Sequence, residues 1–201
     1  MDYEFDYYLI GEAGEPSVPL LKNNDEVDPK GTKPISFKSP VELDSPIYLA
    51  INPPYPAKPN FNVDLLILPS AVYSQKIYDV LAPLNIKNYQ LLPGIIVDRK
   101  GEEHKNFWLE HAYHRISCID TEKSNGKFNS FTKMWRSFES IVLREELLKE
   151  VPLEERLIFR PMETRQFVLY HKSIVDAIMA VKPVNISFMP IVEWHEGVQL
   201  N

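Results

Sequence analysis

The chain has 201 residues, of which 44% are hydrophobic and 25% are charged, and its net charge is -6. This length and composition suffice for a globular core and exclude disorder over the whole chain. A bilayer-spanning helix is excluded because no run approaches about 20 apolar residues, and the lack of a basic footprint argues against direct nucleic-acid binding.

The amino terminus and the cysteine content bear on the compartment. The first residues have neither the basic start nor the apolar stretch of a secretory signal. Cys118 is the one cysteine and cannot form an internal disulfide, which suits a reducing environment. We therefore expect a cytoplasmic protein that makes no contact with a membrane.

Negative charge is concentrated in residues 1–28, which contain eight acidic residues and one basic residue, Lys22. Residues 2–10 alternate acids with aromatics, so that Tyr3, Phe5 and Tyr7 fall on one side. Alternation with a period of two predicts a strand with one buried face and one negative, solvated face. The charge can serve as a docking surface for a basic protein or simply as a solvated edge that keeps the protein soluble.

Residues 11–60 contain ten prolines. Each proline fixes φ and lacks an amide donor, so long helices and central strands are not expected there. We predict loops and short strands, such as one at residues 46–51. In this interpretation the chain is a single domain, in which residues 1–60 pack on a core made by residues 61–201.

From residue 63 onward the pattern becomes regular. Residues 64–68 are a short apolar strand candidate, and the apolar spacing of residues 70–84 predicts a helix with Ser70 as its N-cap or one turn before it. Residues 89–93 then predict a strand that ends at Gly94.

The same layout returns at a fixed offset of 97, where residues 72–93 align with residues 169–190. Five aligned pairs are identical: Tyr73 and Tyr170, Ile77 and Ile174, Asp79 and Asp176, Asn88 and Asn185, Pro93 and Pro190. Chance similarity between two amphipathic helices is the alternative explanation. We predict an α+β fold with mixed or antiparallel sheets and a few helices, in which one helix-strand unit is used twice.

The remaining segments complete the prediction. Residues 106–120 alternate as a strand, with Phe107, Leu109 and His111 on one face. Residues 122–133 are predicted as a polar loop and residues 137–143 as a short strand. The charged segment 144–150 predicts a helical turn stopped by Pro152, and the last predicted strand here is residues 157–159.

A search for reactive groups finds no constellation. His111 and His114 resemble a zinc-binding pair, but on a strand their odd separation sends the two rings to opposite faces. Cys118 lies in an apolar run typical of a buried, unreactive thiol. The acidic pairs at 102–103 and 145–146 indicate solvated turns. We therefore expect no catalytic residue, no cofactor and no metal.

Several segments resemble a known family, the immunity protein 11 type of bacterial polymorphic-toxin systems, long described as a domain of unknown function. The resemblance rests on residues 73–97, 119–124, 158–160 and 170–194. It implies an antitoxin that binds one cognate toxin, delivered by type VI or another contact-dependent secretion route, and it carries over no catalytic residue. Asp120 and Ser124 match the family's segment, but a structural turn accounts for them equally well.

An immunity protein must associate quickly, and opposite charge raises association rates. Many toxins are nucleases with basic grooves, so we expect the acidic face to dock on a basic toxin surface, with aromatic side chains as anchors. The candidate contact residues are Asp2, Glu4, Asp6, Asp25, Glu26, Asp28, Tyr3, Tyr7, Tyr8 and Trp108.

Two other functions remain open from the sequence. One is a small hydrolase with a dispersed site that uses His111 or His171. The other is an acidic regulator that mimics nucleic acid, although the chain has no helix-turn-helix pattern. The oligomeric state and the identity of the toxin stay undetermined at this level.

Overall fold

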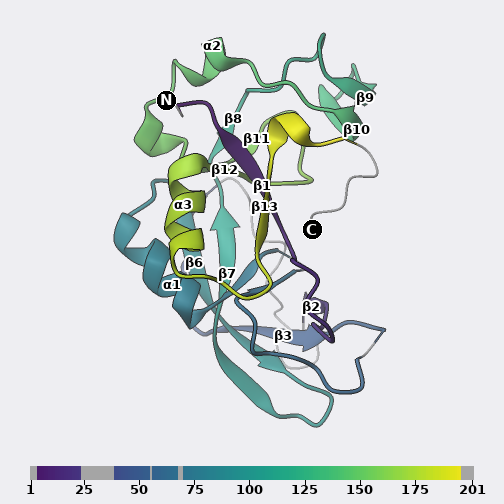
Figure 1. Ribbon diagram of the computed structural model, residues 1–201, viewed down its shortest axis with the longest axis vertical. Coiled ribbons are helices and arrows are strands. Elements are labelled where there is room, and N and C mark those ends of the chain that lie inside the picture. The colour runs from purple at the N-terminus through teal and green to yellow at the C-terminus, as the bar shows by residue number, and fades with distance from the viewer. Residues whose placement is uncertain (1–3, 24–38, 55, 68–69, 196–201) are drawn as a thin grey trace.

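The computed structural model describes residues 4–23, 39–54, 56–67 and 70–195 (Figure 1). It confirms the α+β class with mixed sheets. One sheet has the order β13 (Ser187–Pro190), β1 (Tyr7–Gly11), β12 (Leu169–His171), β11 (Ile158–Pro161) and β8 (Arg115–Ile116). A second sheet has the order β2 (Leu21–Asn23), β3 (Ile47–Ile51), β6 (Tyr89–Val97), β7 (Glu103–Ala112), β5 (Val72–Ser74) and β4 (Leu65–Leu66).

The other elements are short. Strands β9 (Asn125–Asn129) and β10 (Met134–Ser140) form a separate antiparallel hairpin. The helices are α1 (Gln75–Leu81), α2 (Glu145–Leu148) and α3 (Lys172–Ala180), with 3-10 turns η1 (Ala82–Leu84), η2 (Leu153–Glu155) and η3 (Ile191–Glu193). Pairing is antiparallel except between β3 and β6 and between β8 and β11.

The repeated helix-strand unit is confirmed, and it extends to four strands. The order β4-β5-β7-β6 in one sheet corresponds to β11-β12-β1-β13 in the other, and all pairs are antiparallel. The registers agree as well. Tyr73 pairs with Trp108, which pairs with Pro93; correspondingly, Tyr170 pairs with Tyr8, which pairs with Pro190.

The turns repeat at the same offset. Asn85 and Asn88 have left-handed φ angles of 48° and 57°, and Lys182 and Asn185 have 50° and 64°. Such angles are uncommon outside glycine, so four of them in matching places are not explained by two similar helices alone. The units differ in one connection: β7 follows β6 directly, whereas its counterpart β1 comes from the start of the chain.

The two units share a core. Helices α1 and α3 lie side by side (Figure 1), and residues of both, including Ile77 and Ile174, belong to the same buried cluster. Tyr73 and Tyr170 meet there, with their hydroxyl oxygens 3.0 Å apart. The first 60 residues also enter the sheets, because β1 lies between β12 and β13 and β3 pairs with β6.

Some predicted boundaries were right in kind and wrong in extent. The strand at Ile47–Ile51, the helical turn at Glu145–Leu148 and the strand from Ile158 are confirmed. The helix begins at Gln75 with Ser74 as N-cap, because residues 72–74 pair with β7 as a strand, so Ser70 lies one turn before the helix, as the second of the two options predicts. The strand from Tyr89 does not end at Gly94 but continues to Val97, because residues 94–97 pair with β3.

Two predictions between residues 106 and 133 were wrong. The long strand is divided into β7 and β8. The predicted loop at 122–133 contains β9 of the hairpin, where Gly126 adopts a φ of 141° and an added Cβ would lie 2.3 Å from the Ser137 carbonyl oxygen. The glycine thus permits a close approach between strands that a polar composition does not reveal.

Candidate functional site

A buried polar cluster lies where the two units meet. Glu110 on β7 is 3% exposed, and its Oε1 accepts hydrogen bonds from the hydroxyls of Tyr170 at 2.5 Å, Tyr73 at 3.3 Å and Tyr89 at 3.4 Å. Burial and the nearby Glu110 carboxyl raise the pKa of Tyr73 and Tyr170, so both hydroxyls stay protonated. Alternation places Glu110 on the face opposite Leu109 and His111, and it does not reveal that both faces of β7 are buried at this end of the strand.

The charge state of Glu110 depends on opposing effects. Burial raises the pKa of its carboxyl, and the Tyr170 hydrogen bond and the positive charge of Arg160 offset that rise only in part. Arg160 is also buried and donates from Nε to the Ala112 carbonyl oxygen at 3.1 Å. A cavity of about 220 Å³ borders Glu110, Arg160 and Tyr170, and much of its remaining wall is apolar. Tyr73 and Tyr89 of one unit and Tyr170 of the other donate to the same carboxyl, so the cluster is a hydrogen-bonded joint between the two units.

The predicted histidine and cysteine roles can now be placed. His111 Nε2 lies 2.9 Å from the Ser39 carbonyl oxygen, and His114 Nδ1 lies 2.6 Å from the Glu155 carbonyl oxygen, so different parts of the chain hold the two rings. His171 caps α3, because its Nδ1 accepts from the Ser173 amide. Cys118 is buried, and burial raises the pKa of its thiol, which lowers its reactivity.

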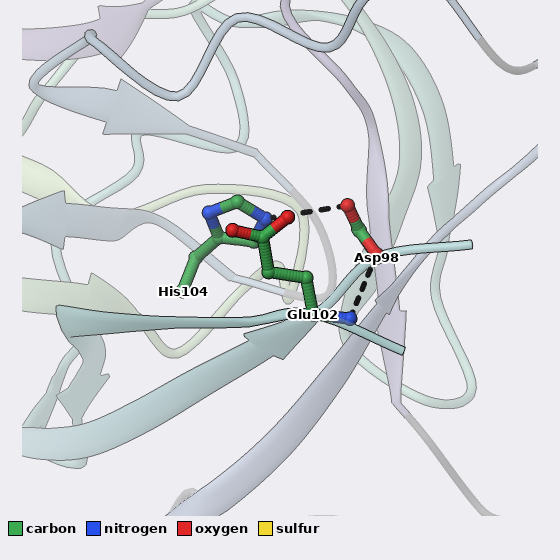
Figure 2. A group of neighbouring side chains, drawn as sticks. All are labelled: Asp98, Glu102 and His104. Atoms are coloured by element: carbon green, nitrogen blue, oxygen red, sulfur yellow. Dashed lines mark hydrogen bonds and ion pairs between the residues drawn. The ribbon is translucent and has the colours of Figure 1, made fainter. Parts of the chain in front are cut away.

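One group with metal-binding chemistry lies at the β6–β7 turn. Ligand atoms of Asp98, Glu102 and His104 lie within 4.8 Å of one another (Figure 2). Asp98 Oδ1 accepts from the amides of Lys100 and Glu102, and the Glu102 amide is the largest cause of the lowered pKa of Asp98. These bonds are those of an aspartate that closes a turn, so we assign Asp98 a structural role.

Asp120 has the same role. Its Oδ1 accepts from the amides of Glu122 and Lys123 at 2.9 and 3.0 Å, and the Ser124 amide donates to its carbonyl oxygen at 3.0 Å. This segment, which carries part of the family resemblance, is therefore a hydrogen-bonded turn next to the hairpin.

The predicted contact residues divide into three groups. Asp2, Tyr3, Asp25, Glu26 and Asp28 lie outside the described residues. Glu4, which is partly exposed, and Tyr7, which is buried, both bind a buried arginine. Asp6, Tyr8 and Trp108 lie at or near the surface, with Asp6 exposed and the two aromatics partly buried.

Glu4 and Tyr7 share one buried partner. Arg156 is 1% exposed and donates to Glu4 Oε1 at 2.8 Å and to the Tyr7 hydroxyl at 2.7 Å. Tyr7 itself is 1% exposed, and burial raises its pKa to about 12 although Arg156 opposes that shift. A side chain so enclosed has no surface to offer a partner, so we leave Tyr7 out of the contact surface.

Tyr8 lies in an acidic environment on β1. Burial raises the pKa of Tyr8, the positive charge of Lys172 is the largest effect that opposes this rise, and the negative charges of Asp6, Asp176 and Glu193 add to it. Asp6, Asp176 and Glu193 are all exposed, and Lys172 forms an ion pair with Asp176 at 2.5 Å. We name Asp6, Tyr8, Asp176 and Glu193 the acidic β1 face.

Trp108 occupies the corresponding position in the other unit. Its ring stacks on Tyr78 of α1 with centroids 3.8 Å apart, and its Nε1 donates to Gln75 at 3.0 Å. Gln75 in turn donates to Asp79, as Lys172 does to Asp176. Trp108 is thus tied to its own helix, whereas Tyr8 is surrounded by charges that reach solvent.

The comparisons with known proteins gave one finding. Residues 10–193 match the model of the Immunity protein family (Imm11). A search of curated proteins found no match. Within the part of the chain that the structure describes, the helices are all too short or too polar to cross a membrane.

Proposed function

The chain belongs to the Immunity protein family (Imm11), and on this premise we propose that it binds and neutralises one cognate protein toxin. The family match over residues 10–193 carries the proposal. The protein acts as a stoichiometric binder rather than an enzyme. Buried positions of His111, His171 and Cys118, each held by neighbouring groups or apolar packing, favour a binder over the alternative hydrolase.

We further propose that the toxin presents a basic surface, as a nuclease groove does. The acidic β1 face and the acidic segment 1–28 support this choice, because opposite charges steer partners together. Tyr8 is the aromatic anchor that these charges surround. In this proposal the toxin arrives by type VI or another contact-dependent route, and the encounter takes place in the cytoplasm without membrane or nucleic acid.

The test uses the product of the neighbouring gene. We expect the two proteins to co-purify, and an excess of this chain to abolish the toxicity of that product. Full toxicity in the presence of excess protein would overturn the proposal.

The contribution of charge is tested by reversal. Changing Asp6→Lys and Glu193→Lys should slow association by about tenfold at low ionic strength, because steering depends on unscreened opposite charge. Glu102→Lys with Glu103→Lys makes the same charge change at the β6–β7 turn and serves as the control. Stopped-flow association rates at two salt concentrations measure the effect, and equal rates for both pairs would reject steering by the β1 face. A separate reversal of Asp25, Glu26 and Asp28 tests the acidic N-terminal segment.

A further inference from the structure

The β9–β10 hairpin carries an aromatic ring in solvent. Phe131, in the turn between the two strands, is 94% exposed, ahead of Val192 at 80% among the large hydrophobic residues described. The other aromatic residues of this hairpin pack inward, since Trp135 and Phe138 are buried and stacked with centroids 4.8 Å apart. One aromatic side chain of the hairpin is therefore directed away from the core.

The turn holds Phe131 in a defined position. Asn129 Oδ1 accepts hydrogen bonds from the amides of Phe131 at 3.0 Å and Thr132 at 3.1 Å. Lys133 closes the turn with a left-handed φ of 55°. An asparagine that bonds the amides two and three residues on fixes the local backbone, so the ring is presented by an ordered turn.

Strand β10 is tied to the body of the protein next to the turn. The Trp135 amide donates to the Glu163 carbonyl oxygen at 2.8 Å, and Gln166 Nε2 donates to the Arg136 carbonyl oxygen at 2.6 Å. An ordered turn beside an anchored strand loses little conformational entropy when a partner covers it. Aromatic residues presented in this way are typical binding hot spots.

The charge around Phe131 identifies the surface that fits it. Lys127, Lys133 and Arg136 are exposed on the hairpin, where Glu139 is the one acidic residue between positions 125 and 140. The hairpin is therefore basic within an acidic chain. A complementary surface combines an apolar pocket for the ring with carboxylates at its rim.

The hairpin lies next to the acidic β1 face. Turn η3, which contains Val192 and Glu193, contacts β1. The following Trp194 packs edge-on against Phe138 of β10 at 6.2 Å, and His195 forms a bridge with Ser140. The end of β10 away from the Phe131 turn therefore lies next to η3, and a partner that covers both surfaces extends along the hairpin.

We propose that Phe131 inserts into an apolar pocket rimmed by carboxylates on the cognate toxin and that it slows dissociation of the complex. This inference rests on the proposed function and adds a second contact surface of opposite charge to the acidic β1 face. The β1 face governs the encounter, and the hairpin governs the lifetime of the complex.

The test compares Phe131→Ala with Leu84→Ala, another exposed apolar residue at 43%, for binding to the product of the neighbouring gene. We expect Phe131→Ala to raise the dissociation rate by about 30-fold or more, as truncation of a hot spot does. Leu84→Ala should change it less than threefold. Lys127→Glu with Arg136→Glu should also weaken binding, and an unchanged unfolding midpoint shows that each variant is folded.

Three results are distinguishable. Wild-type binding that Phe131→Ala weakens supports the inference. Wild-type binding that Phe131→Ala leaves within threefold overturns the inference and leaves the proposed function intact. If the wild-type protein itself neither binds nor neutralises the neighbouring product, the proposed function fails, and the inference fails with it.

Discussion

Replacing Glu110 with alanine should lower the free energy of unfolding by about 3 kcal/mol or more. The hydroxyls of Tyr73, Tyr89 and Tyr170 would lose their common acceptor, and the buried Arg160 would lose a neighbouring carboxyl. Tyr73, Tyr170 and Arg160 remain buried, so water cannot fully replace their lost bonds. Urea unfolding followed by fluorescence and circular dichroism measures the change.

Glu110→Gln is the matched control, because it keeps the size and an acceptor oxygen while removing the charge. Folding raises the pKa of Glu110, so the folded protein binds this proton more readily than the unfolded chain. The resulting stabilisation is present below the unfolded pKa of about 4.3 and is lost as pH rises through the folded pKa. The wild-type protein should therefore lose stability relative to Glu110→Gln as pH rises from about 4. A pH-independent difference between the two proteins would contradict this assignment.

The same variants test the proposal that residues 1–201 form one domain. Tyr73 and Tyr170 belong to different units of the repeat, yet both bond Glu110 and both lie in one buried cluster. Weakening this joint should lower the midpoint of a single unfolding transition. If probes in the two units of Glu110→Ala instead gave two unfolding transitions with different midpoints, the units would fold on their own.

The repeat was predictable because it resides in local sequence. Tyr73, Asn88 and Pro93 have identical counterparts at an offset of 97, and each performs the same local task in both units. The pairing of β1 into the second unit could not be predicted from this pattern. In the first unit the corresponding strand, β7, directly follows β6, whereas β1 comes from the start of the chain. Sequence order alone does not reveal such a permuted connection.

The contact surface was less predictable, for two physical reasons. Alternation places Tyr7 and Tyr8 on opposite sides of a strand but does not say which side is covered, and here the core takes Tyr7. Glu110 could not be predicted from the repeat either, because the residue that occupies the corresponding position in the other unit is the apolar Ile10. The polar composition of residues 122–133 predicts a loop and does not reveal the position of Phe131; the signal that points to it is an aromatic residue isolated among polar neighbours.

Replacing Arg156 with methionine should cost about 3 kcal/mol of stability. The guanidinium donates to the carbonyl oxygens of Val151 and Glu4 as well as to the Tyr7 hydroxyl and the Glu4 carboxylate, at 2.7 to 2.9 Å. Methionine fills much of the same space with apolar atoms but satisfies none of these acceptors. Chemical unfolding gives the stability, and hydrogen exchange at the Lys172 amide, which donates to the Asp6 carbonyl oxygen, reports on the start of the chain.

Lys149→Met is the control that separates two contributions of Arg156 to stability: its buried hydrogen bonds and its positive charge near Phe5. Lys149 Nζ and the Arg156 guanidinium carbon both lie 5.1 Å from the centre of the Phe5 ring, but Lys149 is exposed and Arg156 is enclosed. If the cation over Phe5 were the source of stability, the two variants would lose similar amounts. We expect Lys149→Met to lose less than about 0.5 kcal/mol, as exposed positions do. A large loss in Arg156→Met alone would show that the buried hydrogen bonds of the guanidinium, rather than a cation over Phe5, stabilise the start of the chain.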